Sequence, residues 1–192
     1  MKLDILFVHP NASKVIYQGL AKKNSAIEPP IWAGMLANSA LAKGHSAEIL
    51  DAEVMALDYQ SCAEVIKDAK PRIVCFVVYG QQPSASSQNM EGAVATANRL
   101  KEIEPKSFII FVGGHLAALP QETLDKEHCI DAVCQNEGVY TIQSLLKITK
   151  FNDQELAKVN GLCFRKQDGF IQTNDPSKVV ARSDLDIELP GI

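Results

Sequence analysis

Four short polar segments, each following an apolar run of strand length, carry the side chains of this sequence that could bind a ligand. The candidate binding residues are His9, Asn11, Tyr79, Gly80, Gln81, Gly113, Gly114, His115, Asn136, Glu137 and Gly138. Glycines expose bare main chain, and the other residues add amide donors and acceptors with little formal charge. This chemistry suits a large ligand that is fringed with neutral amides and carries one phosphate, which could rest on a helix N-terminus.

Each segment also has a purely structural interpretation that the sequence leaves open. Gly113-Gly114 can serve only to turn the chain at the end of a strand. Asn136 and Glu137 can simply cap the helix that follows them. Tyr79 can be a core residue whose hydroxyl reaches the rim.

The elements that position these segments alternate regularly along the chain. Strands are predicted over residues 3–8, 47–50, 73–78, 108–112 and 130–134. Helices are predicted over 29–43, 120–126 and 138–148. Another helix begins at Asp58 or Ser61, and one more follows a polar, turn-rich stretch at 80–87 and ends at about residue 104. We therefore predict a doubly wound, five-stranded parallel sheet (flavodoxin-like, order 2-1-3-4-5), in which ligands bind at the carboxyl ends of the strands.

The stretch between the first strand and the first helix departs from this alternation. Residues 9–28 show little regular pattern, and so long a loop in a compact domain is usually functional or disordered. In the helix that follows, Trp32, Met35, Leu36, Ser39 and Ala40 share one helical stripe.

The C-terminal part differs in character from the rest. Residues 162–164 and 170–171 flank Gln167-Asp168-Gly169, a favourable hairpin turn, and after Asn174 the chain becomes polar and irregular. We predict a domain over residues 1–150, then a hairpin and linker over 151–192 that belong to a longer protein.

Composition and charge exclude several classes of function. The net charge is −4 and no basic block occurs, which argues against nucleic acid as a partner. No apolar run approaches the roughly 18 residues that would span a membrane. The N-terminus has no leader pattern, so a cytoplasmic location is expected.

The cysteines do not form a metal motif. The sequence has five, at irregular spacing and without Cys-x-x-Cys, so neither a zinc site nor any other metal ligand is predicted. Cys75, Cys134 and Cys163 lie in strand-like runs, where cysteine behaves as a small buried hydrophobe. The nicotinamide fingerprint Gly-x-Gly-x-x-Gly is absent, and no catalytic triad can be assigned.

Taken together, several motifs resemble the cobalamin-binding N-terminal domain of radical S-adenosylmethionine enzymes. Pro29 to Ala37 resembles the Pro-Pro-x-x-x-Gly helix start, and residues 43–51 and 71–74 look like the second and third strands of that family. Val112 to Glu122 resembles its Gly-Gly-x-His…Pro-Glu signature, and Asn136-Glu137-Gly138 its Gly-Glu-Gly turn, with asparagine in place of the first glycine. Residues 159–165 resemble its hairpin, and 185–190 its Asp-Leu-Pro lead into the catalytic barrel.

The resemblance implies that the chain binds cobalamin as a module of a larger enzyme. The nucleotide tail of the cofactor would insert between sheet and helices, and the corrin ring would lie over the strand ends. The parent enzyme would also use S-adenosylmethionine and a four-iron four-sulfur cluster in a separate barrel domain, for methyl transfer or a radical cyclisation or rearrangement.

Three departures from the family pattern refine this expectation. The Asp-x-His-x-x-Gly motif that supplies a cobalt ligand is replaced by Phe7 to Ala12, so we expect a displaced tail and no histidine on cobalt. Val77 stands where related domains often place a serine beneath the tail. Cys-x-x-x-Cys-x-x-Cys is absent, so the chain alone does not cleave S-adenosylmethionine.

Two other functions stay open at this point. The domain could be a docking or scaffold module that has the fold and binds no cofactor, because fold alone does not fix function. It could also hold a different nucleotide-tailed ligand in the same crevice. The substrate and reaction of the parent enzyme are not indicated by any residue pattern.

Overall fold

A computed structural model of the chain describes residues 3–12, 29–79 and 83–190. Its centre is a seven-stranded sheet with the order β2-β1-β3-β4-β5-β6-β7. The strands are β1 (Ile5–His9), β2 (Ala47–Asp51), β3 (Ile73–Val77), β4 (Ile109–Val112), β5 (Ala132–Cys134), β6 (Leu162–Arg165) and β7 (Ile171–Thr173).

The sheet is mostly parallel, which confirms the predicted α/β class. Strands β1 to β5 pair in parallel, with Ile5 opposite both Ala47 and Ile73. Strands β6 and β7 pair antiparallel, and β6 lies directly against β5. The sheet therefore has seven strands rather than the predicted five, because the edge of β5 is paired by a strand from the C-terminal part of the chain.

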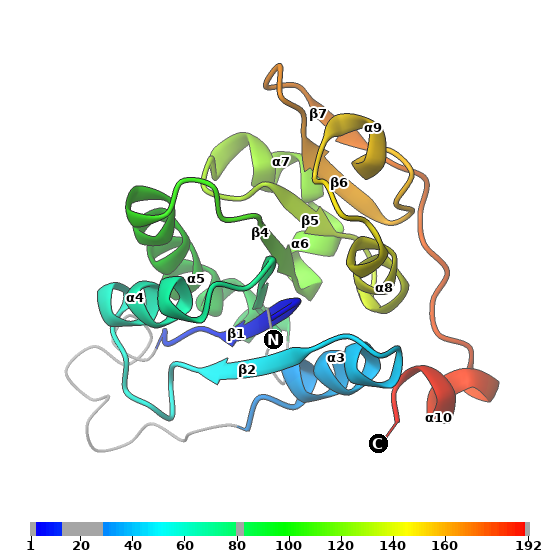
Figure 1. Ribbon diagram of the computed structural model, residues 1–192, viewed down its shortest axis with the longest axis horizontal. Coiled ribbons are helices and arrows are strands. Elements are labelled where there is room, and N and C mark those ends of the chain that lie inside the picture. Colours follow the sequence, from blue (N-terminus) through cyan, green and yellow to red (C-terminus); the bar gives the residue numbers. More distant parts are fainter. Residues whose placement is uncertain (1–2, 13–28, 80–82, 191–192) are drawn as a thin grey trace.

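Helices cover both faces of this sheet (Figure 1). On one side lie α3 and α8, and on the other lie α4, α5 and α7 (Figure 1). The helices are α3 (Ile31–Ala42), α4 (Tyr59–Ala69), α5 (Pro83–Ile103), α6 (Gly114–Ala118), α7 (Pro120–Lys126), α8 (Val139–Lys147), α9 (Asp153–Leu156) and α10 (Leu185–Glu188), with a 3-10 turn η2 (Arg182–Asp184).

The hydrophobic core is correspondingly double. Phe7 and its neighbours on one face pack against α3 and α8, whereas Val8 and Phe76 on the other face pack against α4 and α5. Strands β1, β3, β4 and β5 are buried on both faces, so their sequences are continuous apolar runs rather than alternating ones.

Local sequence signals explain several helix boundaries. Asp58, one of two predicted caps, accepts a hydrogen bond from the Ser61 amide at 2.8 Å and begins α4. Helix α5 begins at Pro83, inside the stretch that was predicted as turn-rich, since proline suits a first helical turn. The short helix α6 was not predicted, because five residues are too few to show a period.

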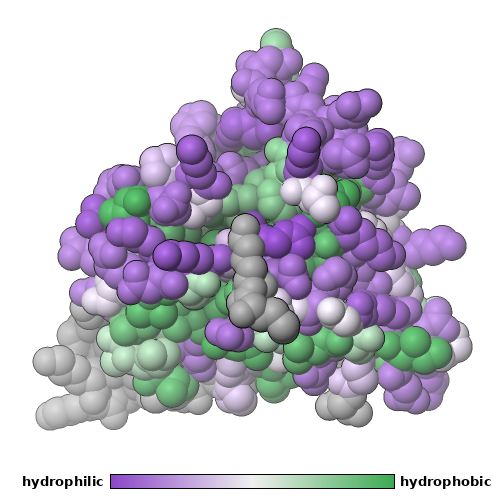
Figure 2. Space-filling view, viewed as in Figure 1, coloured by the Kyte–Doolittle hydropathy of each residue, from purple (hydrophilic) through white to green (hydrophobic). Residues whose placement is uncertain are grey.

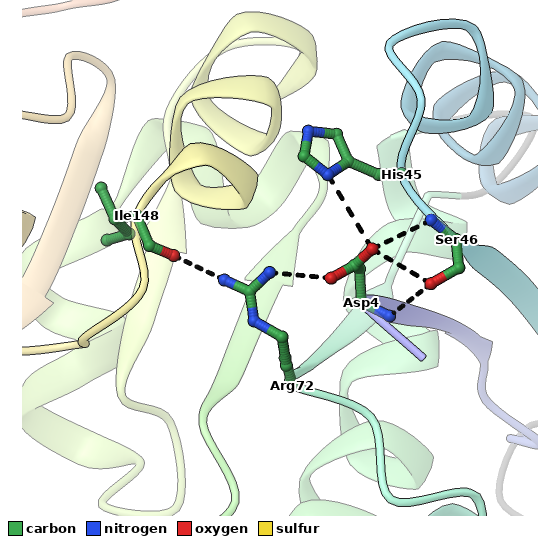
Figure 3. Close-up of polar contacts among 5 residues, drawn as sticks. All are labelled: Asp4, His45, Ser46, Arg72 and Ile148. Atoms are coloured by element: carbon green, nitrogen blue, oxygen red, sulfur yellow. Dashed lines mark hydrogen bonds and ion pairs between the residues drawn. The ribbon is translucent and has the colours of Figure 1, made fainter. Parts of the chain in front are cut away.

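Charged residues at the N-terminal edge of the sheet form a structural network (Figure 3). The Asp4 carboxylate accepts hydrogen bonds from Arg72 Nη1 at 2.8 Å and from the Ser46 amide at 3.0 Å. His45 Nδ1 lies 3.9 Å from the same carboxylate, and Arg72 also donates to the Ile148 carbonyl. The network joins the start of β1 to the segments that precede β2 and β3 and follow α8.

The chain continues past β7 as an extended segment on the α3 and α8 side and ends in α10 beside α3 (Figure 1). On the face shown in Figure 2, apolar side chains gather in its lower part, over β2 and the neighbouring helices. Among the described helices, none is long and apolar enough to cross a membrane.

Candidate functional site

The carboxyl ends of β1, β3, β4 and β5 lie at one edge of the sheet, and the predicted binding residues follow them. Of these residues, Gly80 and Gln81 lie outside the described part of the chain. The others are described, and their contacts assign them to different parts of the rim.

The β1 loop is held against the turn that follows β2. His9 is buried, and its Nε2 lies 3.5 Å from the Oε2 of Glu53. Its main-chain oxygen accepts a hydrogen bond from Ala52 at 3.0 Å, and Asn11 Nδ2 donates to the Leu57 carbonyl at 3.0 Å. The Nε2 of His9 therefore faces a carboxylate from the protein, a partner that lies 44 positions away and that no sequence motif indicates.

Tyr79 connects the end of β3 to the turn after β5. Its hydroxyl donates a hydrogen bond to the main-chain carbonyl of Asn136 at 3.2 Å. Its ring stacks on Trp32 at the start of α3, with centroids 4.5 Å apart and an interplanar angle of 25°. Burial, with smaller contributions from nearby acidic groups, raises the pKa of Tyr79 to about 12, so its hydroxyl stays protonated and donates at neutral pH.

Trp32 takes part in the rim without having been predicted there. It was placed on the apolar stripe of its helix, yet 41% of its surface is exposed, whereas Ala33, Leu36 and Ala37 are buried. The available signal was its place in the first turn of α3, since helices of parallel α/β units begin at the same edge where strands end.

Asn136 and Glu137 bind the segment that follows β7. Asn136 Nδ2 donates to the Ser177 carbonyl at 3.1 Å, and Glu137 Oε2 accepts from the Val180 amide at 2.9 Å. Gly138, with φ of 78°, is the N-cap of α8, which has no side-chain cap hydrogen bond. These two side chains thus anchor another part of the chain rather than capping the helix.

The two glycines after β4 have different surroundings. A β-carbon on Gly113 would lie 2.7 Å from Val78 Cγ2, so close packing against β3 requires glycine there. Around the corresponding position on Gly114 there is open space, with nothing within 4 Å. Of the predicted glycines that the structure describes, Gly114 is therefore the one whose main chain a ligand could approach from outside.

His115 lies on the α5 and α7 side of the rim. Its Nδ1 is 3.5 Å from the Ser87 hydroxyl oxygen, and it lines a cavity of about 130 Å³ together with Met90 and Thr123. This cavity is smaller than the roughly 300 to 1,000 Å³ of typical ligand pockets. His115 is thus on the opposite face of the sheet from the Tyr79–Asn136 contact.

Metal-binding side chains do not gather at this rim. Within the described ranges, no three His, Cys, Asp or Glu residues are grouped so that they could hold a metal ion. The described donors of the rim are mostly main-chain groups and amides, with one phenol, the Glu137 carboxylate and the imidazoles of His9 and His115, and this mixed set without a grouped metal site suits an organic ligand more than a bare ion.

Comparison with known families identifies the class of domain to which this fold belongs. The family model described as the B12 binding domain matches residues 18–146. This chain belongs to that family.

Two curated relatives match most of the chain. It is 28% identical over 163 residues to an uncharacterized methyltransferase of Pyrococcus horikoshii, a match that covers 85% of this chain and 33% of the relative. It is 26% identical over 163 residues to the anaerobic magnesium-protoporphyrin IX monomethyl ester cyclase of Synechocystis sp., with 85% and 31% covered. The chain thus spans about a third of the length of the curated relatives it matches.

Solved structures of cobalamin-dependent radical enzymes share the fold. OxsB with aqua-cobalamin bound superposes with a TM-score of 0.67 at 15% identity, covering 97% of this chain and 23% of OxsB. TsrM from Kitasatospora setae, with cobalamin and a [4Fe-4S] cluster bound, gives 0.67 at 16%, with 95% and 30% covered. At these identities the likeness shows the fold alone.

Proposed function

We propose that this chain is the cobalamin-binding module of a larger radical S-adenosylmethionine enzyme. The observation that carries the proposal is the B12 binding domain match over residues 18–146, which includes the ends of β3, β4 and β5. The chain's coverage of about a third of its relatives supports a further domain in the parent. When bound, the cofactor would carry a methyl group or assist a radical step of that parent.

The rim offers two features that fit the macrocycle of such a cofactor, namely open main chain and exposed apolar side chains. Gly114 presents main chain to open space, so a flat ligand can approach it without meeting a side chain. Ile31 and Trp32 are exposed at the start of α3 and offer apolar surface at the same edge. We place the corrin ring over this edge and its tail between the sheet and helices α3 and α8.

We further propose that no histidine of this chain ligates the cobalt. His9 is buried, and its Nε2 is 3.5 Å from Glu53 Oε2, so this nitrogen is directed at a carboxylate. The chemistry of S-adenosylmethionine cleavage is assigned to the barrel domain of the parent, which would hold the iron-sulfur cluster. The role of this chain is then to bind and orient the cofactor beneath that domain.

Reconstitution with aquacobalamin tests the proposal. After incubation and desalting, the chain should retain corrinoid, measured by visible absorbance and by cobalt content. Gly114→Val should lower retention, because its side chain would occupy the open approach, whereas Lys106→Val, at an exposed turn before β4 and so at the opposite edge of the sheet, should not. Lack of retained corrinoid at micromolar protein would contradict the proposal.

The cobalt ligation can be tested on the same sample. With the bound cofactor reduced to Co(II), the electron paramagnetic resonance spectrum should show no splitting from a nitrogen ligand, and His9→Ala should leave it unchanged. A nitrogen splitting that disappears in His9→Ala would contradict the assignment.

A second function is favoured by one specific observation. Tyr79 and Trp32 lie stacked across the edge where the cofactor tail would enter, and Tyr79 is hydrogen-bonded to the far side of that edge. A module with this arrangement permanently closed would be a docking or scaffold domain that binds no cofactor. Retention of corrinoid decides between the two.

A further inference from the structure

Two aromatic side chains close the edge of the sheet between α3 and α8. In the sheet, β4 lies between β3 and β5. Tyr79 follows β3 and its hydroxyl reaches the carbonyl of Asn136, which follows β5, so the side chain spans the end of β4. Trp32 of α3 stacks on the same ring and extends the closure to the helix layer.

The main chain on either side of the contact between Tyr79 and Asn136 is held by other hydrogen bonds. Asn136 is held by its own side chain, which donates to Ser177, and by the adjacent Glu137, which accepts from Val180. The main-chain carbonyl of Tyr79 is held by Asn89 Nδ2 at 3.2 Å. Opening the contact therefore needs only the Tyr79 ring to move, and this ring must then leave its packing against the hydrophobic core on the α3 and α8 side.

The forces that hold the ring are individually modest. A stacked aromatic pair and a neutral hydrogen bond each favour the closed arrangement by about two- to tenfold. Trp32 is 41% exposed, so part of its surface is already in water. Packing of the Tyr79 ring against the core adds to these forces, so the arrangement is closed without ligand.

We propose that Trp32 and Tyr79 form a gate over the cofactor crevice, with the hydrogen bond from Tyr79 to the Asn136 carbonyl as its latch. The inference rests on the proposed function and concerns the nucleotide tail in particular. A corrinoid whose tail enters between the sheet and α3 must separate the rings and break the latch, whereas a corrinoid without a tail need not. Apparent affinity for the tailed ligand is then reduced by the fraction of molecules that are open.

The stack itself can be tested before any ligand is added. Trp32 is the sole tryptophan of the chain, so intrinsic tryptophan fluorescence reports on this site. Tyr79→Ala should shift the emission maximum to longer wavelength, because the indole loses its stacked partner and gains water. Tyr59→Ala, at a half-exposed tyrosine on α4, should leave the emission unchanged. An unchanged emission in Tyr79→Ala would overturn the gate.

The latch is tested by association kinetics with two corrinoids, aquacobalamin and cobinamide, of which only the first has a nucleotide tail. Tyr79→Phe keeps the ring and removes the hydroxyl, so it should speed aquacobalamin association about two- to tenfold and leave cobinamide association unchanged. Tyr59→Phe should alter neither rate. Equal rates for wild type and Tyr79→Phe with aquacobalamin, or an equal acceleration with both corrinoids, would overturn the gate.

The gate and the proposed function can fail separately. If the wild type binds aquacobalamin and Tyr79→Phe binds it no faster, only the gate is wrong. If neither protein retains either corrinoid, the proposed function is wrong and the gate falls with it.

Discussion

Val78 fills the space that a side chain on Gly113 would need, because a β-carbon there would lie 2.7 Å from both Val78 Cγ2 and the Val78 carbonyl oxygen. A contact this short with main chain cannot relax without moving a strand. The adjacent Gly114 has open space instead. The two glycines of one motif thus have separate roles, one in packing β3 against the end of β4 and one in exposing main chain.

This difference predicts that the same substitution is destabilising at Gly113 and nearly neutral at Gly114. Gly113→Ala should lower the free energy of unfolding by about 1 to 3 kcal/mol, the usual cost of overpacking. Gly114→Ala should change it by less than about 0.5 kcal/mol. Urea unfolding followed by circular dichroism measures both values, and equal effects of the two substitutions would contradict the assignment.

The Asp4 network predicts a pH-dependent stability. Burial alone would raise the pKa of Asp4, but hydrogen bonds from Arg72 and Ser46, with the charge of Arg72, outweigh it and lower the pKa. Because the folded pKa is below the unfolded value of about 4, this stabilisation is present at neutral pH and is lost as the pH falls through the lowered pKa. The other partners of the network are in Figure 3.

Asp4→Asn tests this directly. At pH 7 it should lower the free energy of unfolding by about 1 to 2 kcal/mol, since the pair with Arg72 is partly exposed and partly screened. The difference from wild type should begin to shrink as the pH falls below about 4 and should approach zero only below the lowered folded pKa, where the folded wild-type carboxyl is itself protonated. A constant difference from pH 3 to pH 7 would show that Asp4 acts by packing rather than by charge.

The cysteines should be chemically inert in the folded protein. All five are buried and unpaired in disulfides, as was predicted for Cys75, Cys134 and Cys163. Burial is the main cause that raises the pKa of Cys62 and of Cys134 to about 12 and that of Cys129 to about 11. Little of each thiol is therefore ionised at pH 8, and the thiolate is the form of cysteine that alkylating reagents attack.

Mass spectrometry after iodoacetamide treatment at pH 8 checks this expectation. The native protein should remain unmodified over minutes, and all five cysteines should react in denaturant. Fast alkylation of one cysteine in the native protein would show that its site opens or that its thiol is activated.

Much of the architecture was predictable because its signals are local. Continuous apolar runs such as Ile73–Val77 and Ile109–Val112 indicate strands buried on both faces, and their alternation with helices gives a parallel sheet. The hairpin strands at 162–164 and 170–171 were predicted, but their joining of the sheet was missed, because β6 pairs with β5 across almost thirty intervening residues, which no local pattern records.

The location of the candidate site was likewise predictable, but the direction of its side chains was not. Chain position places Tyr79, Asn136 and Glu137 at the ends of β3 and β5. The partners of Asn136 and Glu137 lie 41 and 43 positions further along the chain. A single sequence does not encode which distant segment will compete with a ligand for these side chains, so their part in binding stays a prediction.

The attachment of α10 gives a last prediction. Glu188 accepts a hydrogen bond from Gln143 of α8 at 2.8 Å and lies 3.0 Å from Lys43 at the end of α3. Leu189 is only 6% exposed and packs into the core between these helices. We therefore expect residues 182–190 to be held against α3 and α8 in solution, rather than to behave as a free linker.

Limited trypsin digestion at Arg182 measures this attachment, because cleavage requires the segment to detach. Leu189→Ala should speed cleavage at Arg182 about tenfold or more, since truncation of a buried leucine costs about 2 to 5 kcal/mol. The matched control is Ile187→Ala on the same helix, whose side chain is 64% exposed and should leave the rate unchanged. If cleavage at Arg182 is equally fast in wild type and Leu189→Ala, the segment is not held, and the contacts of Glu188 do not anchor it.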